Sequence, residues 1–153
     1  MIKPELYKKT VDILYQAYFN DELEHGNCAA CAVGNICAGN GIPRHHPDLR
    51  QEINNASWRF KFMTRLGQQR VKETAPASAM KVIRATGYTW RQLARIEYAF
   101  ETAWTGYSKE DHMFNGLVAV LEVLKEIHQV TDADEINNER FESHYKTRSK
   151  VLG

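Results

Sequence analysis

Apolar residues recur at steps of three and four along most of this chain, and that spacing restricts the fold to helices. The clearest case follows Gly106, where Ser108 and Asp111 are typical of a capped helix start. Its apolar face would be Met113, Leu117, Val120, Leu121, Leu124 and Ile127. We find no alternating strand pattern and no Asn-Gly turn joining two such runs. The sequence therefore predicts an all-α fold.

Glycine, proline and capping residues divide the rest of the chain. Pro4 suits the opening turn of a first helix, and Gly26-Asn27 predicts a stop followed by a new cap, so that a short second helix opens at Cys28. Asp48 would cap a long third helix that ends before Pro76.

Three further signals complete the predicted bundle. A short helix over 78–86 would be closed by Gly87, and the pair Thr89 and Gln92 fits a capping box that opens the next helix. The pattern weakens after residue 131. We expect about six to seven helices in a single domain, 1–153, with the core in 1–130 and a weaker helix or tail in 131–153.

Composition indicates an ordinary globular protein. The chain has 153 residues, of which 43% are apolar and 25% charged. No uncharged apolar run approaches the roughly 18 residues of a membrane span, and charges occupy the N-terminus where a secretory signal needs its apolar core. We therefore expect a cytoplasmic protein with no membrane partner.

Charge is unevenly distributed although the net charge is +1. Residues 49–99 carry +7 and residues 100–136 carry −6. The two segments could neutralise each other, or the basic one could meet an external anion such as nucleic acid.

All three cysteines lie in one short run with a histidine, and zinc binding is one interpretation. His25, Cys28, Cys31 and Cys37 are the side chains that zinc prefers. On one straight helix, however, Cys37 would point about 180° away from Cys28, so the backbone would have to break near Gly34. We expect no cofactor, with zinc as the alternative.

Redox chemistry is a second interpretation of the same run. Cys28 and Cys31 would lie in the first turn of the second helix, where the dipole favours a thiolate. A Cys-x-x-Cys that opens a helix in an all-α protein resembles the alkylhydroperoxidase-D and carboxymuconolactone-decarboxylase families. The resemblance implies a redox pair at Cys28 and Cys31, with Asn35 and Gln16 where redox members of those families place a histidine and a glutamate. The third interpretation is that the cysteines are small apolar core residues, which also explains the neighbouring alanines.

The segment 79–96 has the outline of a helix-turn-helix. Val82, Tyr88, Leu93 and Ile96 would join its two helices, leaving Arg91, Gln92 and Arg95 to contact bases. Lys61 and Arg65, on the basic side of the third helix, would add phosphate contacts.

No catalytic pattern stands out from the sequence. The pairs Glu97/Glu101 and Glu122/Glu126 lack the histidines of di-iron bundles, so we expect solvated helix faces. We therefore expect a non-catalytic interaction module whose partner is a protein rather than nucleic acid. Its expected surface is the basic side of the third helix with Thr89 to Arg95; association with a second copy stays open. Nucleic-acid binding through 79–96 and a thiol or metal protein are the alternatives.

Overall fold

Six helices account for most of the residues that the computed structural model describes, namely 4–24, 31–42, 80–103 and 108–152. No strand occurs within these ranges, so the all-α prediction is confirmed. In chain order the helices are α1 (Pro4–Phe19), α2 (Ala32–Gly39), α5 (Met80–Thr86), α6 (Trp90–Thr102), α7 (Lys109–His128) and α8 (Ala133–Leu152). The predicted long helix between Asp48 and Pro76 lies outside the described residues.

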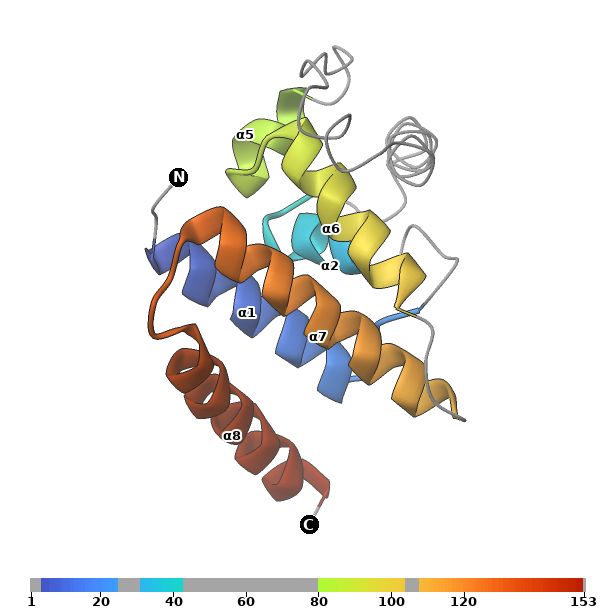
Figure 1. The fold of residues 1–153 in the computed structure, drawn as a ribbon. Coiled ribbons are helices and arrows are strands. Elements are labelled where there is room, and N and C mark those ends of the chain that lie inside the picture. The colour runs from blue at the N-terminus through green and yellow to red at the C-terminus, as the bar shows by residue number, and fades with distance from the viewer. Residues whose placement is uncertain (1–3, 25–30, 43–79, 104–107, 153) are drawn as a thin grey trace.

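Helix α1 is the element against which α2, α7 and α8 pack (Figure 1). Helix α7 runs antiparallel to α1, because Tyr7 contacts His128 whereas Tyr18 contacts Phe114. Helix α8 runs parallel to α1, because Tyr7 bonds to Asn137 whereas Phe19 contacts Tyr145. Helix α6 packs on α7 and α2, and α5 contacts α2.

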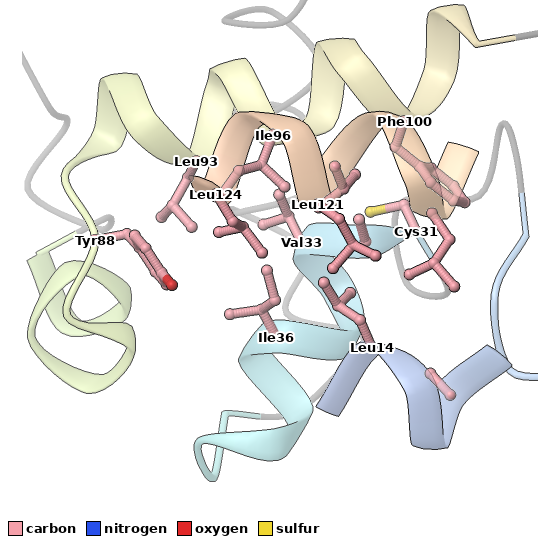
Figure 2. Packing of buried hydrophobic residues seen from close by; sticks show 14 of the residues in the cluster. Leu14, Cys31, Val33, Ile36, Tyr88, Leu93, Ile96, Phe100, Leu121 and Leu124 are labelled. Carbon is pink, nitrogen blue, oxygen red and sulfur yellow. The ribbon is translucent and has the colours of Figure 1, made fainter. Parts of the chain in front are cut away.

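A buried apolar cluster takes residues from all six of these helices. Figure 2 shows its central part, where side chains of α1, α2, α6 and α7 pack together. Leu14 of α1, Ile36 of α2 and Leu124 of α7 are completely inaccessible to solvent. Burying one such side chain stabilises the fold by roughly 1.5–3 kcal/mol, so this cluster holds the helices together. None of the described helices is long and apolar enough to cross a membrane.

The predicted starts of α6 and α7 are confirmed, because each helix has a capping hydrogen bond to the predicted residue. Thr89 Oγ1 accepts from the Gln92 backbone N–H, and the Gln92 side chain accepts from the Thr89 N–H, which completes a capping box. Ser108 caps α7 by accepting from the Asp111 N–H at 3.1 Å. Gly87 follows α5 with a φ of +79°, as a stop signal requires.

Two predicted boundaries near the N-terminus are wrong. Helix α1 ends at Phe19, not at Gly26, because Asp21 adopts a left-handed φ of 58° and the Glu22 N–H closes back onto the Ala17 carbonyl. Helix α2 begins at Ala32, and Cys31 is its cap rather than a residue of its first turn.

The C-terminal segment is a complete 20-residue helix, α8, where the sequence predicted a weaker helix or a tail. Its sequence has little apolar periodicity, because most of its residues face solvent. Packing against α1 therefore stabilises α8, although the sequence of α8 has no strong amphipathic pattern of its own.

Two glycines with positive φ allow a matched test of the turn before α6. An alanine Cβ at Gly87 would meet Leu6 Cδ2 at 3.0 Å, whereas at Gly41 (φ +83°) it would meet nothing within 4 Å. We expect Gly41→Ala to cost about 1 kcal/mol from backbone strain alone, and Gly87→Ala about 1 kcal/mol more. Urea unfolding measures both. In a Leu6→Ala background, Gly87→Ala should lower the free energy of unfolding by no more than Gly41→Ala does. If the two glycine variants lose equal stability and Leu6→Ala makes no difference, the close contact between Gly87 and Leu6 is contradicted.

Candidate functional site

The two described cysteines belong to the core. Cys31 and Cys37 are both fully buried, at the two ends of α2. Cys31 Sγ accepts a hydrogen bond from the Gly34 N–H at 3.3 Å, which makes the thiol the N-cap of α2. Cys28, the other half of the predicted redox pair, lies outside the described residues.

The predicted zinc ligands are only partly testable, because His25 also lies outside the described residues. Cys37 lies six positions after Cys31, which corresponds to a rise of about 9 Å along a helix axis. Two thiolates on one zinc must lie within about 4.6 Å of each other, given a Zn–S distance of about 2.3 Å. In the part of the chain that the structure describes, no group of three potential metal ligands comes together.

Asn35, at a position singled out by the resemblance, has a structural role. Its side-chain Nδ2 donates to the carbonyls of Glu22 and Cys31, at 2.9 and 3.0 Å. These bonds tie the segment after α1 to the start of α2. Gln16, the other position, lines the same pocket as Asn35, which has a volume of about 160 Å³.

The helix-turn-helix outline is present, but two of its three predicted base-reading side chains are engaged within the protein. Val82, Tyr88, Leu93 and Ile96 are buried, as predicted. Gln92 is held in the capping box, and Arg95 forms an ion pair with Glu126 of α7. Arg91 is half-buried, and Lys61 and Arg65 lie outside the described ranges.

The sequence did not predict the buried polar chain that crosses this core. Thr10 Oγ1 donates to the Leu6 carbonyl at 2.8 Å, and the Tyr88 hydroxyl lies 2.8 Å from Thr10 Oγ1 and 2.9 Å from His128 Nε2. Because the single hydroxyl hydrogen of Thr10 is used on Leu6, Tyr88 donates to Thr10 and accepts from His128. The network thereby assigns the ring proton of His128 to Nε2. It joins α1, the turn before α6 and the end of α7.

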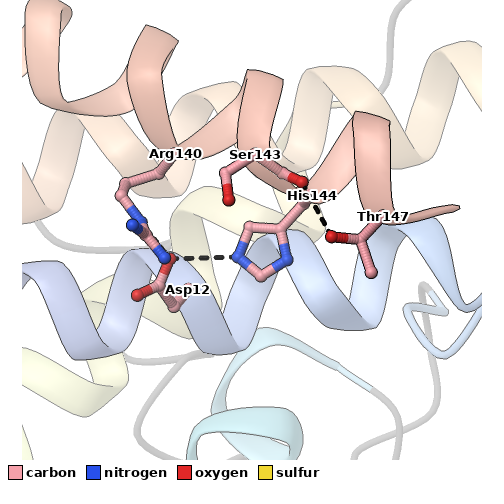
Figure 3. Close-up of polar contacts among 5 residues, drawn as sticks. All are labelled: Asp12, Arg140, Ser143, His144 and Thr147. Carbon is pink, nitrogen blue, oxygen red and sulfur yellow. Dashed lines mark hydrogen bonds and ion pairs between the residues drawn. The ribbon is translucent and has the colours of Figure 1, made fainter.

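A polar cluster on α1 and α8 also went unpredicted (Figure 3). Asp12 Oδ1 accepts from Arg140 Nε at 2.6 Å and from His144 Nε2 at 3.0 Å. The hydrogen bond to Asp12 raises the pKa of the Arg140 guanidinium. Beside the cluster lies a pocket of about 420 Å³, with both cationic and anionic walls. Lys8, Lys9 and Arg140 line this pocket together with Glu5 and Asp12. Asp12 contacts Arg140 and His144 of α8, so we assign the cluster a structural role in attaching α8 to α1.

Partly exposed aromatic side chains form a continuous surface where α1, α7 and α8 meet. Phe114 contacts Tyr18, Tyr18 contacts Phe19, and Phe19 contacts both Phe141 and Tyr145. Val118 lies one turn from Phe114 on α7. We name this the aromatic surface: Tyr18, Phe19, Phe114, Val118, Phe141 and Tyr145. Its members come from three separate parts of the chain, so no local motif marks it.

We expected both glutamate pairs to lie on solvated helix faces. This prediction is confirmed for Glu122 and Glu126, but it is wrong for Glu97. Glu122 and Glu126 are exposed, as predicted, whereas Glu97 is only 2% exposed. Glu97 lies on the α6 face that turns to the core, one residue from Ile96. The i,i+4 spacing of the two glutamates in the sequence does not show whether the carboxyl group of Glu97 is buried or exposed to solvent.

Comparisons of the chain with protein-family models, with curated protein sequences and with solved structures found no match.

Replacing Tyr88 by phenylalanine tests the buried polar chain. Tyr88→Phe keeps the ring but leaves the His128 N–H and the Thr10 oxygen without this partner, so we expect a loss of about 2 kcal/mol. Tyr145→Phe removes an exposed hydroxyl and should change stability by less than about 0.5 kcal/mol. Denaturant unfolding compares the two variants. Equal effects would show that the Tyr88 hydroxyl contributes no net stability.

The buried tyrosines predict a loss of stability at alkaline pH. Burial, with a smaller contribution from Tyr7, raises the pKa of Tyr15 from 10.0 to about 12. The native state then retains a proton that the unfolded chain releases, so stability is intact below pH 10 and falls as pH rises toward 12. Tyr15→Phe should flatten this decline, measured by urea unfolding between pH 9 and 11.5. An unchanged slope would contradict the assignment.

Proposed function

We propose that the chain is a non-catalytic module that binds another protein through the aromatic surface. The observation that carries the proposal is the joint exposure of large apolar side chains. Phe114 and Val118 are 41% exposed and Tyr145 is 53% exposed. Single exposed apolar residues need no explanation, but a contiguous aromatic set is typical of protein-binding surfaces.

The alternatives receive less support from the described residues. For a thiol protein, Cys31 and Cys37 are inaccessible to a substrate without opening of the core. For a nucleic-acid reader, Gln92 and Arg95 would first have to leave the capping box and the ion pair. We therefore propose the aromatic surface as the interaction surface, in place of the Thr89–Arg95 turn that the sequence favoured.

Site-specific photo-crosslinking in cells that naturally produce the chain tests the proposal. We expect a photoreactive residue at Val118 to give protein adducts several-fold more often than one at exposed Arg84 of α5. Phe114→Ser should abolish the Val118 adducts, because it removes the neighbouring anchor. The matched control is Met80→Ser, which removes a 40%-exposed apolar side chain from α5 and should leave the adducts unchanged.

Two outcomes would overturn this function. Equal labelling at Val118 and Arg84 would mean that the aromatic surface makes no preferred contact. Adducts that disappear on nuclease treatment would favour nucleic acid as the partner.

A further inference from the structure

The exposed face of α7 has acidic residues at both ends of its apolar part. Asp111, Phe114, Val118 and Glu122 are exposed and follow one another at steps of three, four and four residues, so they form one stripe. The stripe is about 16 Å long at 1.5 Å per residue. Two apolar side chains one turn apart are thus placed between two carboxylates.

Further carboxylates lie beside the rest of the aromatic surface. Asp21 is exposed two residues beyond Phe19, and Glu142 is exposed next to Phe141 on α8. Lys146 is an exposed cation on the same part of α8. Arg148 of α8, one turn beyond Tyr145, is a second and half-buried cation. The exposed carboxylates of Asp111, Glu122, Asp21 and Glu142 outnumber these two cations, so negative charge prevails among these described residues.

This charge distribution disfavours three classes of occupant. A second copy placed symmetrically on the surface would set the same carboxylates against each other. Nucleic acid and anionic lipid would be repelled in the same way. A partner that covers the aromatic side chains while supplying positive charge at the edge satisfies both features.

We infer that the aromatic surface receives a basic amphipathic helix of a partner protein. The helix would place two apolar side chains, one turn apart, on Phe114 and Val118 and direct lysine or arginine toward Asp111 and Glu122. The apolar contact would supply most of the affinity, and the edge charges would set orientation and association rate. This inference rests on the proposed function above and specifies its partner.

Two helical peptides of about 16 residues test the inference with the full chain. Both carry leucines one turn apart; one has lysine at the flanking positions and the other glutamate. We expect the lysine peptide to bind at least tenfold more tightly in fluorescence anisotropy at low salt, and its affinity to fall several-fold at high salt. Glu122→Lys should weaken the lysine peptide several-fold and strengthen the glutamate peptide. Phe114→Ser should abolish binding of both, whereas Met80→Ser should change neither.

The contrary outcomes distinguish failure of the basic-helix inference from failure of the proposed function. Equal binding of the two peptides, or insensitivity to Glu122→Lys, would overturn the basic partner. The crosslinks at Val118 would still stand and would support a protein partner of other chemistry. If sedimentation instead detects a dimer that Phe114→Ser dissolves, the occupant is a second copy. Failure of both peptides together with loss of the Val118 crosslinks would overturn the proposed function itself.

Discussion

The burial of α1 is the constraint on which the rest of the structure depends. Its Tyr7, Val11 and Leu14 face the core shared with α2 and α7, while Tyr15 and Phe19 contact Phe141 of α8. One helix thus presents apolar side chains in two directions, which a single amphipathic stripe could not do. Loss of α1 would remove the surface on which three other helices pack.

Polar contacts fix the positions of helices that apolar burial alone would leave free to slide. The hydroxyl of Tyr88 joins α1 to the end of α7 through Thr10 and His128. Asp12 and Tyr7 attach α8 through Arg140, His144 and Asn137. Hydrogen bonds are directional, so these contacts select one register among several that hydrophobic packing would accept.

The arrangement of α8 also accounts for the aromatic surface. Because α8 runs parallel to α1, its Tyr145 reaches the end of α1 at Phe19, and the antiparallel α7 brings Phe114 to the same end. Aromatic residues from three segments therefore meet at one edge of the bundle. The exposed acidic residues of α7 lie along the same edge, and their negative charge is the reason for which we propose a basic partner.

Local chemistry in the sequence was sufficient for the helical class and for several boundaries. Thr89 with Gln92, Ser108 and Gly87 mark helix ends because their hydrogen bonds and backbone angles involve only near neighbours in the chain. The apolar residues of α7 were predicted for the same reason: their period reports which side is buried. In contrast, Asp21 ended α1 early through a left-handed conformation that aspartate adopts without a distinctive motif.

Tertiary structure alone decided which polar residues have a structural role and which side chains form the aromatic surface. Gln92 and Arg95 looked available for a ligand, yet one caps a helix and the other pairs with Glu126, 31 residues away. Helix α8 is weakly patterned and became a full helix because α1 offered it aromatic and charged contacts. The sequence by itself determined the helical class and the caps of α6 and α7, since these signals involve only near neighbours in the chain. The packing determined the candidate site, because its side chains converge from α1, α7 and α8 only after the chain has folded.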